Sequence, residues 1–285
     1  MAEAIAELAE TAQAGPVLEV SGMRKEFGDL VAVDDVSFAV PQATSLAIVG
    51  ESGSGKTTIA RMIVGLERAT AGTITACGRD RSAPARSARD RRRRGSEVQI
   101  VFQDPYTSLD PRQTAEATID EVLRLHHGWA RDRRRARIAE LTGLVGLDDR
   151  QARALPRALS GGQRQRVAIA RALAAEPRVL ILDESVAALD VSIQAQVLNL
   201  LADIRDSTGV SYVLISHDLA VVRQLTDDVI VLHRGVVVER GKTAGVLDDP
   251  RHDYTKRLRA SVPRPGWKPR RGALQLTAGE EPKNL

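Results

Sequence analysis

Residues 50–58 read G-E-S-G-S-G-K-T-T, and this stretch decides the fold. Gly50, Gly55, Lys56 and Thr57 occupy every fixed position of the G-x-x-x-x-G-K-[ST] phosphate-binding loop. A loop that wraps a polyphosphate must bring its backbone N–H groups close to the anion, and glycine permits the conformations this needs. The lysine can reach the β- and γ-phosphates, and the threonine hydroxyl can ligate Mg²⁺. The stretch therefore predicts a site for a nucleoside triphosphate with Mg²⁺.

The flanking residues place this loop between a strand and a helix. Residues 45–49 (S-L-A-I-V) form a short apolar run typical of a buried strand. Residues 58–66 carry apolar side chains at helical spacing, and the start of a helix adds its positive end to the same anion. A chance glycine-rich turn is the alternative, but the full pattern in strand–loop–helix order argues against it. We predict an α/β fold.

Composition sets limits on compartment and partners. The 285-residue chain has 41 lysines and arginines against 37 aspartates and glutamates, so its net charge is only +4 and we expect no nucleic-acid partner. The single cysteine, Cys77, excludes an intrachain disulfide framework. No apolar run approaches the ~18 residues that span a bilayer. Residues 1–16 lack the basic start of a secretory signal and are predicted to form a flexible tail, so we expect a cytoplasmic protein.

A second apolar run ends in two carboxylates. Residues 178–182 (R-V-L-I-L) predict a buried strand that leads directly into Asp183 and Glu184. In phosphoryl transfer, one such carboxylate holds Mg²⁺ and the other orients or deprotonates the attacking water. A further strand over residues 210–215 precedes His217. A lone histidine is usually structural, but at the carboxyl edge of a sheet, where ligands bind in open α/β folds, we favour a sensor of the γ-phosphate.

Residues 159–163 (L-S-G-G-Q) open a long predicted helix. Ser160 stands at the N-cap position, and two glycines after it expose backbone N–H groups. The chain therefore has a second helix start that suits an anion.

Other segments leave alternatives open. Phe27 is either a core residue, which the residues alone favour, or a platform for an adenine ring. The arginine-rich run 86–94 is either a site for RNA or acidic lipid or a solvated, charged helix start, which we favour because no aromatic residues interleave with it. We expect antiparallel strands over 17–27 and 31–40, and helices over 106–158 with separate pieces at 131–139 and 141–147. A strand over 98–102, a hairpin over 229–240, a short helix from Pro250 to Ser261 and a disordered end over 263–285 complete the expectation.

Taken in order, these motifs resemble the ATP-binding subunit of an ABC (ATP-binding cassette) transporter over residues 17–262. Residues 50–58 are similar to Walker A, 178–184 to Walker B and 159–163 to the ABC signature. Gln103 matches the Q-loop and His217 the switch histidine. Phe27 matches the aromatic that stacks on adenine, which reverses the preference for core packing. The resemblance implies nucleotide contacts from Phe27, Gly50, Glu51, Ser52, Gly53, Ser54, Gly55, Lys56, Thr57, Thr58, Ser160, Gly161, Gly162 and Gln163.

The resemblance also implies an architecture and a reaction. The fold would be a P-loop NTPase (RecA-like) core with an antiparallel β subdomain and an inserted α-helical subdomain. The boundaries would be a tail at 1–16, an ABC ATPase domain at 17–248 with helical insertion at about 104–175, and an extension at 249–285. The reaction would be ATP hydrolysis, with Glu184, His217 and Gln103 as catalytic residues and Thr57, Gln103 and Asp183 holding Mg²⁺.

Two segments are similar to the oligopeptide, dipeptide and nickel importer group: V-F-Q-D-P-Y-T-S-L-D-P-R at 101–112 and the tail at 249–263. Three positions depart from the usual pattern, with Asp253 and Ser185 in place of prolines and Ala187 in place of a serine.

Membership would imply several partners at the cytoplasmic face of the membrane. They are a second ATPase subunit (a second copy or a sister chain), two membrane-spanning permeases and, indirectly, an extracytoplasmic solute-binding protein. Peptides are the expected cargo, and nickel or another small solute is the alternative cargo. A non-transport ABC ATPase is the remaining alternative for the function.

Overall fold

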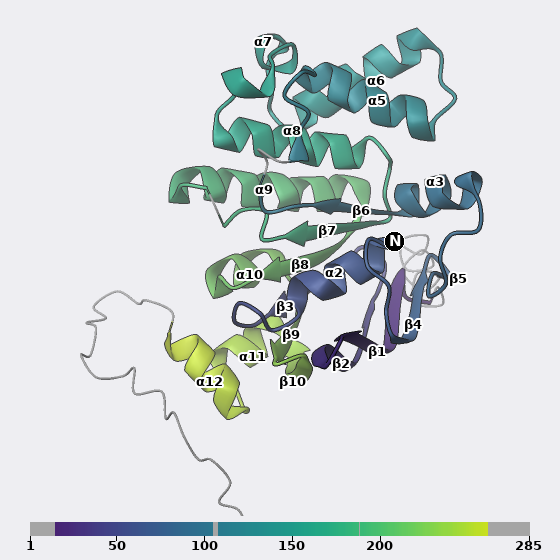
Figure 1. The fold of residues 1–285 in the computed structure, drawn as a ribbon. Coiled ribbons are helices and arrows are strands. Elements are labelled where there is room, and N and C mark those ends of the chain that lie inside the picture. The colour runs from purple at the N-terminus through teal and green to yellow at the C-terminus, as the bar shows by residue number, and fades with distance from the viewer. Residues whose placement is uncertain (1–14, 105–107, 188, 262–285) are drawn as a thin grey trace, which may run out of the picture.

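The computed structural model describes residues 15–104, 108–187 and 189–261. Helices and two sheets surround the phosphate loop, with a group of helices at one end and the smaller sheet at the other (Figure 1). The predicted flexible tail, apart from residues 15 and 16, and the predicted disordered end over 263–285 lie outside the described residues.

The larger sheet has six strands in the order β10-β9-β3-β8-β7-β6. Strand β3 runs parallel to β8 and β9, β7 runs parallel to β8 and β6, and only β10 is antiparallel to its neighbour. The strands span β3 Ser45–Val49, β6 Val98–Val101, β7 Val179–Asp183, β8 Ser211–Ser216, β9 Asp228–His233 and β10 Val236–Lys242.

Both faces of this sheet are buried, which explains why its strands are continuous apolar runs. Ala47 and Val49 face a core shared with α8, α9 and the other helices of that side. Leu46 and Ile48 point the other way, into a core shared with α2 and the smaller sheet. Because side chains alternate in direction along β3, each face of the sheet packs against a different layer.

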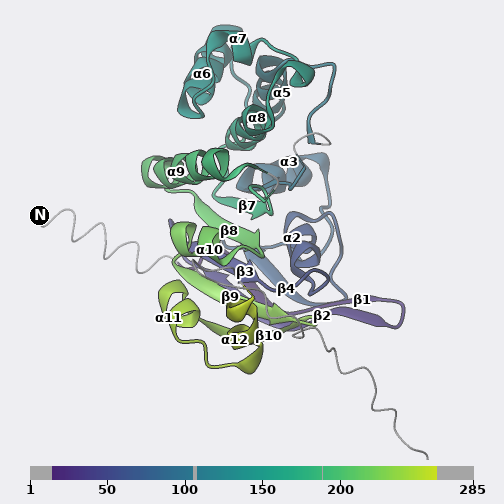
Figure 2. The ribbon, with the colours of Figure 1, turned by 90° about the vertical axis from the view of Figure 1, so that its left-hand side faces the viewer.

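The smaller sheet is antiparallel, in the order β2-β1-β4-β5. Its first two strands are the predicted antiparallel pair and form a hairpin, with Phe27 paired to Leu30 across the turn. Figure 2 shows this hairpin extending beyond the main body of the molecule. The strands span β1 Leu18–Phe27, β2 Leu30–Val40, β4 Ala71–Ala76 and β5 Arg79–Asp80.

The helices divide into two groups. Those from α5 to α8 lie together at one end in both views and fall within the predicted range 104–175 (Figures 1 and 2). Helix α6 runs unbroken where two pieces were expected, and it ends at Leu144, before the expected end at 147, because Gly146 adopts a positive φ of 67°. The first group spans α5 Ala115–His126, α6 Arg131–Leu144, α7 Asp149–Ala152, the 3₁₀ turn η1 Pro156–Ala158 and α8 Gly161–Leu173. The others are α2 Lys56–Val64, α3 Ala88–Glu97, α9 Val191–Thr208, α10 Leu219–Leu225, α11 Thr243–Asp248 and α12 Asp253–Ala260.

This arrangement confirms the predicted fold class: a P-loop core, an antiparallel sheet and an inserted helical group. Within residues 15–104, 108–187 and 189–261, no helix combines the length and apolar character needed to cross a bilayer.

Candidate functional site

Four strands deliver the predicted site residues to one edge of the larger sheet. Strands β3, β6, β7 and β8 are mutually parallel, so their carboxyl ends lie at the same edge. The phosphate loop follows β3, and Gln103 follows β6. Asp183 ends β7, with Glu184 directly after it, and His217 follows β8. Residues far apart in the sequence therefore meet at this edge.

Two glycines of the phosphate loop are required by close backbone approach. A Cβ on Gly50 would lie 2.2 Å from the Leu232 carbonyl oxygen. Gly55 has a φ of +104°, and a Cβ there would lie 2.5 Å from the Ala32 carbonyl oxygen. Any side chain at either position would force the loop away from β9 or β2.

The loop has the charge and the free donors that a polyphosphate needs. Lys56 is buried, and its Nζ donates to the carbonyls of Gly50 (2.8 Å) and Glu51 (2.7 Å) within the same loop. Burial lowers the pKa of this ammonium, and nearby carboxylates, Glu184 first, partly oppose that shift. The Ser54 hydroxyl is buried and has no hydrogen-bond partner among the residues that the structure describes. Both groups would gain a partner from a bound phosphate. The remaining loop positions, Ser52, Gly53 and Thr58, are exposed or half-buried.

A buried carboxylate lies next to the hydroxyl of Thr57. The Thr57 hydroxyl donates to Asp183 Oδ1 at 3.2 Å. Asp183 is only 4% exposed, and burial raises its pKa, although the Thr57 hydrogen bond lowers it. A buried carboxylate beside a hydroxyl is a donor set that suits Mg²⁺.

Glu184 and His217 lie close enough to act on one ligand. Glu184 Oε1 is 3.4 Å from His217 Nδ1, although 33 positions separate the two residues in the sequence. The Glu184 backbone has a φ of +48°, an uncommon conformation for a residue with a side chain, and its N–H donates to the Ile215 carbonyl at 2.9 Å. This bond ties the carboxylate's backbone to β8, the strand that carries the histidine.

Phe27 and Gln103 are placed at the surface. The Phe27 ring is 47% exposed, so it is not part of the core, and Lys25 Nζ lies 4.5 Å from the ring centroid. Gln103 is exposed just beyond β6. Residues 105–107, in the segment that follows it, lie outside the described residues.

The signature residues begin α8 with a capping box. Ser160 accepts from the Gln163 N–H (3.3 Å), and the Gln163 side chain accepts from the Ser160 N–H (2.8 Å). Gly162 is buried, and a Cβ there would lie 2.4 Å from Ile193 Cγ2 on α9. A Cβ on Gly161 would make only an ordinary contact, 3.9 Å from Leu189 Cδ2. In Figure 1, α8 and α2 lie on opposite sides of β6 and β7, and their buried side chains belong to different cores, so the helix that begins at the signature and the helix that follows the phosphate loop pack on opposite faces of the larger sheet.

The three departures have different surroundings. Ser185 is buried, and within the described part of the chain its hydroxyl has no partner, whereas Ala187 is half-buried. Asp253 occupies the first position of α12, where a proline would also fit, and pairs with Lys256 at 3.0 Å. An acidic residue in the first turn stabilises a helix, so the helix start survives this change.

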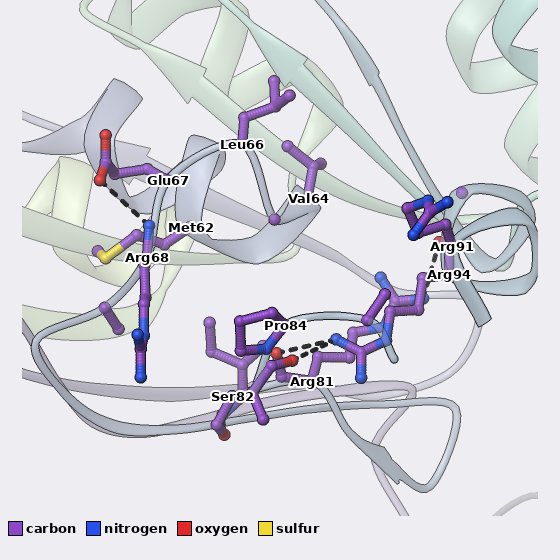
Figure 3. Close-up of a pocket in the computed structure, with 16 residues that line it drawn as sticks. Met62, Val64, Leu66, Glu67, Arg68, Arg81, Ser82, Pro84, Arg91 and Arg94 are labelled. Carbon is purple, nitrogen blue, oxygen red and sulfur yellow. Dashed lines mark hydrogen bonds between the residues drawn. The ribbon is translucent and has the colours of Figure 1, made fainter. Parts of the chain in front are cut away.

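A cavity of about 540 Å³ lies at the far end of α2 (Figure 3). Since a helix rises about 1.5 Å per residue, the nine residues of α2 separate it from the phosphate loop by roughly 13 Å. The predicted arginine run contributes to its wall from α3, which begins at the N-cap Ser87 as a charged helix. Figure 3 labels Met62, Leu66, Pro84, Arg81, Arg91 and Arg94 along the wall.

One residue at the site was not predicted. The Tyr254 hydroxyl, on α12, accepts a hydrogen bond from the Glu51 N–H at 3.0 Å. The sequence signal was present, because Tyr254 lies in the tail segment that resembles an importer motif. That motif indicated a group of proteins and gave no indication of a contact with the phosphate loop.

Comparison with known proteins agrees with this geometry. A family model described as "ABC transporter" matches residues 33–187. The chain is 48% identical over 269 residues to a Brucella abortus (strain 2308) protein provisionally named a peptide import ATP-binding protein, covering 93% of this chain and 78% of that protein. It is 42% identical to the dipeptide transport ATP-binding protein DppF of Escherichia coli (strain K12), covering 89% of this chain and 75% of DppF.

Solved structures show the same fold. MJ0796, a dimeric ATP-binding cassette in a post-hydrolysis state with ADP and Pi, matches with a TM-score of 0.71 and 29% identity, covering 79% of this chain and 98% of that chain. The protein cbiO1 of Clostridium perfringens, part of the ABC transporter complex cbiONQ, matches with a TM-score of 0.74 and 25% identity, covering 83% of this chain and 92% of that one. The chain therefore belongs to the ABC transporter family, as an ATPase subunit of its oligopeptide and dipeptide transport group.

Proposed function

We propose that ATP hydrolysis by this chain powers the import of oligopeptides or dipeptides. The names of the relatives and the tail segment at 249–263 support a peptide cargo. Import of nickel or another small solute is the second candidate, since the same tail motif occurs in that importer group. A non-transport ABC ATPase is a weaker candidate, because only about a hundred residues separate the phosphate loop from the signature and no heptad array lies between them.

The contact between Glu184 and His217 carries the proposed chemistry. Glu184 takes a proton from water, whose oxygen attacks the γ-phosphorus while the bond to the bridging oxygen of ADP breaks. His217 hydrogen-bonds the γ-phosphate and holds it beside the carboxylate. Thr57, Asp183 and Gln103 hold Mg²⁺, which neutralises phosphate charge when it is bound.

The nucleotide is proposed to lie between two chains. Lys56 and the N–H groups of the phosphate loop hold the phosphates, except the N–H of Glu51, which donates to Tyr254. Phe27 stacks on the adenine ring. Residues 160–163 of a second ATPase subunit complete the site. Two observations support this: the signature start is exposed at Ser160, and α8, which begins there, packs on the opposite face of the larger sheet from α2, which follows the loop of its own chain. MJ0796, the solved relative, is itself dimeric.

The partners follow from transport. The second ATPase subunit is a copy of this chain or a sister chain, and two permeases hold the pair at the cytoplasmic face of the membrane. The segment after Gln103 contacts a permease, and an extracytoplasmic solute-binding protein supplies the cargo to the permeases.

Glu184→Gln tests the two-chain site. The amide cannot accept the proton from water, so ATP should persist and the protein should be dimeric by light scattering in saturating Mg-ATP. Glu176→Gln makes the same change at an exposed residue outside the site, which also has a positive φ (53°), and should stay monomeric under these conditions. A monomeric Glu184→Gln protein would contradict pairing of identical chains, and mixing it with a sister ATPase would be the next measurement.

Uptake tests the cargo. A strain of the source organism lacking this chain should lose uptake of labelled di- and oligopeptides, and the wild-type chain should restore it while Glu184→Gln should not. Loss of nickel uptake with normal peptide uptake would favour the second candidate.

A further inference from the structure

Tyr254 joins the C-terminal extension to the phosphate loop. Its side chain is 2% exposed, and its hydroxyl accepts from the Glu51 N–H at 3.0 Å across 203 positions of sequence. Glu51 is the second residue of the loop. The extension therefore contacts the loop backbone directly.

The Tyr254 ring is held in place by the hairpin between β9 and β10. It packs on the His233 ring, with 3.9 Å between centroids. The same hairpin contacts the loop a second time, because the Gly235 N–H donates to the Ser54 carbonyl at 3.0 Å. The tyrosine and the hairpin thus form one support behind the phosphate loop.

The start of α12 is anchored to the same hairpin. Glu239, on β10, accepts from the backbone N–H groups of Arg251 (2.8 Å) and His252 (3.1 Å). Arg259 donates to the Asp248 carbonyl at 2.6 Å and ties down the other end of the helix. With both ends fixed, the hydroxyl has little freedom to leave Glu51.

The Glu51 residue is held through both of its backbone polar groups. Its N–H donates to the Tyr254 hydroxyl, and its carbonyl accepts from Lys56 Nζ at 2.7 Å. A phosphate that attracts the Lys56 ammonium would draw it from this carbonyl. The hydrogen bond to Tyr254 uses no group that would bind phosphate, so it can persist in both the nucleotide-free and the nucleotide-bound protein.

We propose that Tyr254 is a positioning residue for ATP binding, whose hydroxyl fixes the Glu51 peptide and so pre-orders the phosphate loop. The inference rests on the proposed role of residues 50–58 in holding ATP. By this route the extension adjusts the affinity of the ATPase for its nucleotide, because a loop ordered in advance loses less conformational freedom on binding.

The test compares two tyrosines that differ in what the hydroxyl contacts. Tyr254→Phe removes the bond to Glu51. Tyr212→Phe is the matched control, because its hydroxyl is also buried and also bonded to backbone, to the Leu201 carbonyl at 2.8 Å, away from the loop. The dissociation constant for ATP and the KM for ATP should rise about 2- to 10-fold in Tyr254→Phe, the factor expected for one neutral hydrogen bond. The kcat at saturating ATP should stay near wild type.

A purely structural role gives the opposite pattern, with kcat falling as folded protein is lost and KM unchanged. Hydrogen exchange at the Glu51 amide is a direct measure of this bond. The exchange rate should increase in Tyr254→Phe and not in Tyr212→Phe. Wild-type affinity and KM in Tyr254→Phe, or an equal rise in both variants, would overturn the inference. Lys56→Ala distinguishes failure of the proposed ATP site from failure of the inference about Tyr254. If Lys56→Ala leaves ATP affinity intact, the assignment of the loop fails. If it abolishes binding while Tyr254→Phe behaves as wild type, only the inference about Tyr254 fails.

Discussion

Gly162→Ala tests why the signature needs its second glycine. The added methyl would lie 2.4 Å from Ile193 Cγ2, whereas carbon atoms pack best at about 3.5–4.0 Å. Ile193 is β-branched and stiff in a helix, so its methyl cannot turn away and α8 or α9 must move. Such overpacking costs about 1–3 kcal/mol, and the gain in helix propensity from glycine to alanine offsets at most ~1 kcal/mol of it.

With the full offset, about 0–2 kcal/mol of destabilisation remains. The melting temperature without nucleotide should therefore fall by up to about 8 °C, given roughly 2–4 °C per kcal/mol for a domain of this size. Gly161→Ala is the matched control one position earlier, where the nearest atom, Leu189 Cδ2, would be 3.9 Å from the new methyl. Its melting temperature should equal that of the wild type or exceed it slightly. Differential scanning calorimetry of both variants makes the comparison.

A double variant shows whether the clash is the cause. Ile193→Ala deletes the methyl that Gly162→Ala meets, so the double variant should be more stable than the sum of the two single changes predicts, by about 1 kcal/mol or more. Equal melting temperatures for Gly161→Ala and Gly162→Ala would refute the packing argument. If Gly161→Ala is stable but loses ATPase activity, the first glycine serves the nucleotide of the partner subunit, as proposed.

Three further changes test the nucleotide site. Lys56→Ala should abolish ATP binding by isothermal titration calorimetry because it removes the loop's ammonium, whereas Lys242→Ala, at an exposed position on β10, should bind normally. Phe27→Ala should weaken ATP binding at least about fivefold, since aromatic stacking on a base contributes ~1–3 kcal/mol. Leu30→Ala, at the exposed position paired with Phe27, should have no effect on that affinity. Asp183→Asn should raise the Mg²⁺ concentration that gives half-maximal ATPase activity, and an unchanged Mg²⁺ dependence would contradict the assignment of Asp183 as a ligand.

The sequence by itself determined the local parts of this protein. The phosphate loop, the carboxylate pair after β7 and the capping box of Ser160 and Gln163 depend on residues within a few positions of one another. Apolar runs predicted the buried strands, and alternation predicted the antiparallel hairpin of β1 and β2. These patterns depend only on nearby residues, so they specify local structure and chemical groups whatever their position in the tertiary structure.

Only the tertiary structure decided which of these parts meet. The strand order places β3 beside β8 and one strand from β7, so Thr57 lies 3.2 Å from Asp183 across 126 positions of sequence. Packing of α8 on α9 decided that Gly162, and not Gly161, has no room for a side chain. The contact of Tyr254 with Glu51 depends on where α12 docks after the last strand. Each of these contacts is set by the burial of apolar faces between distant elements, and a local pattern does not specify which faces will be joined.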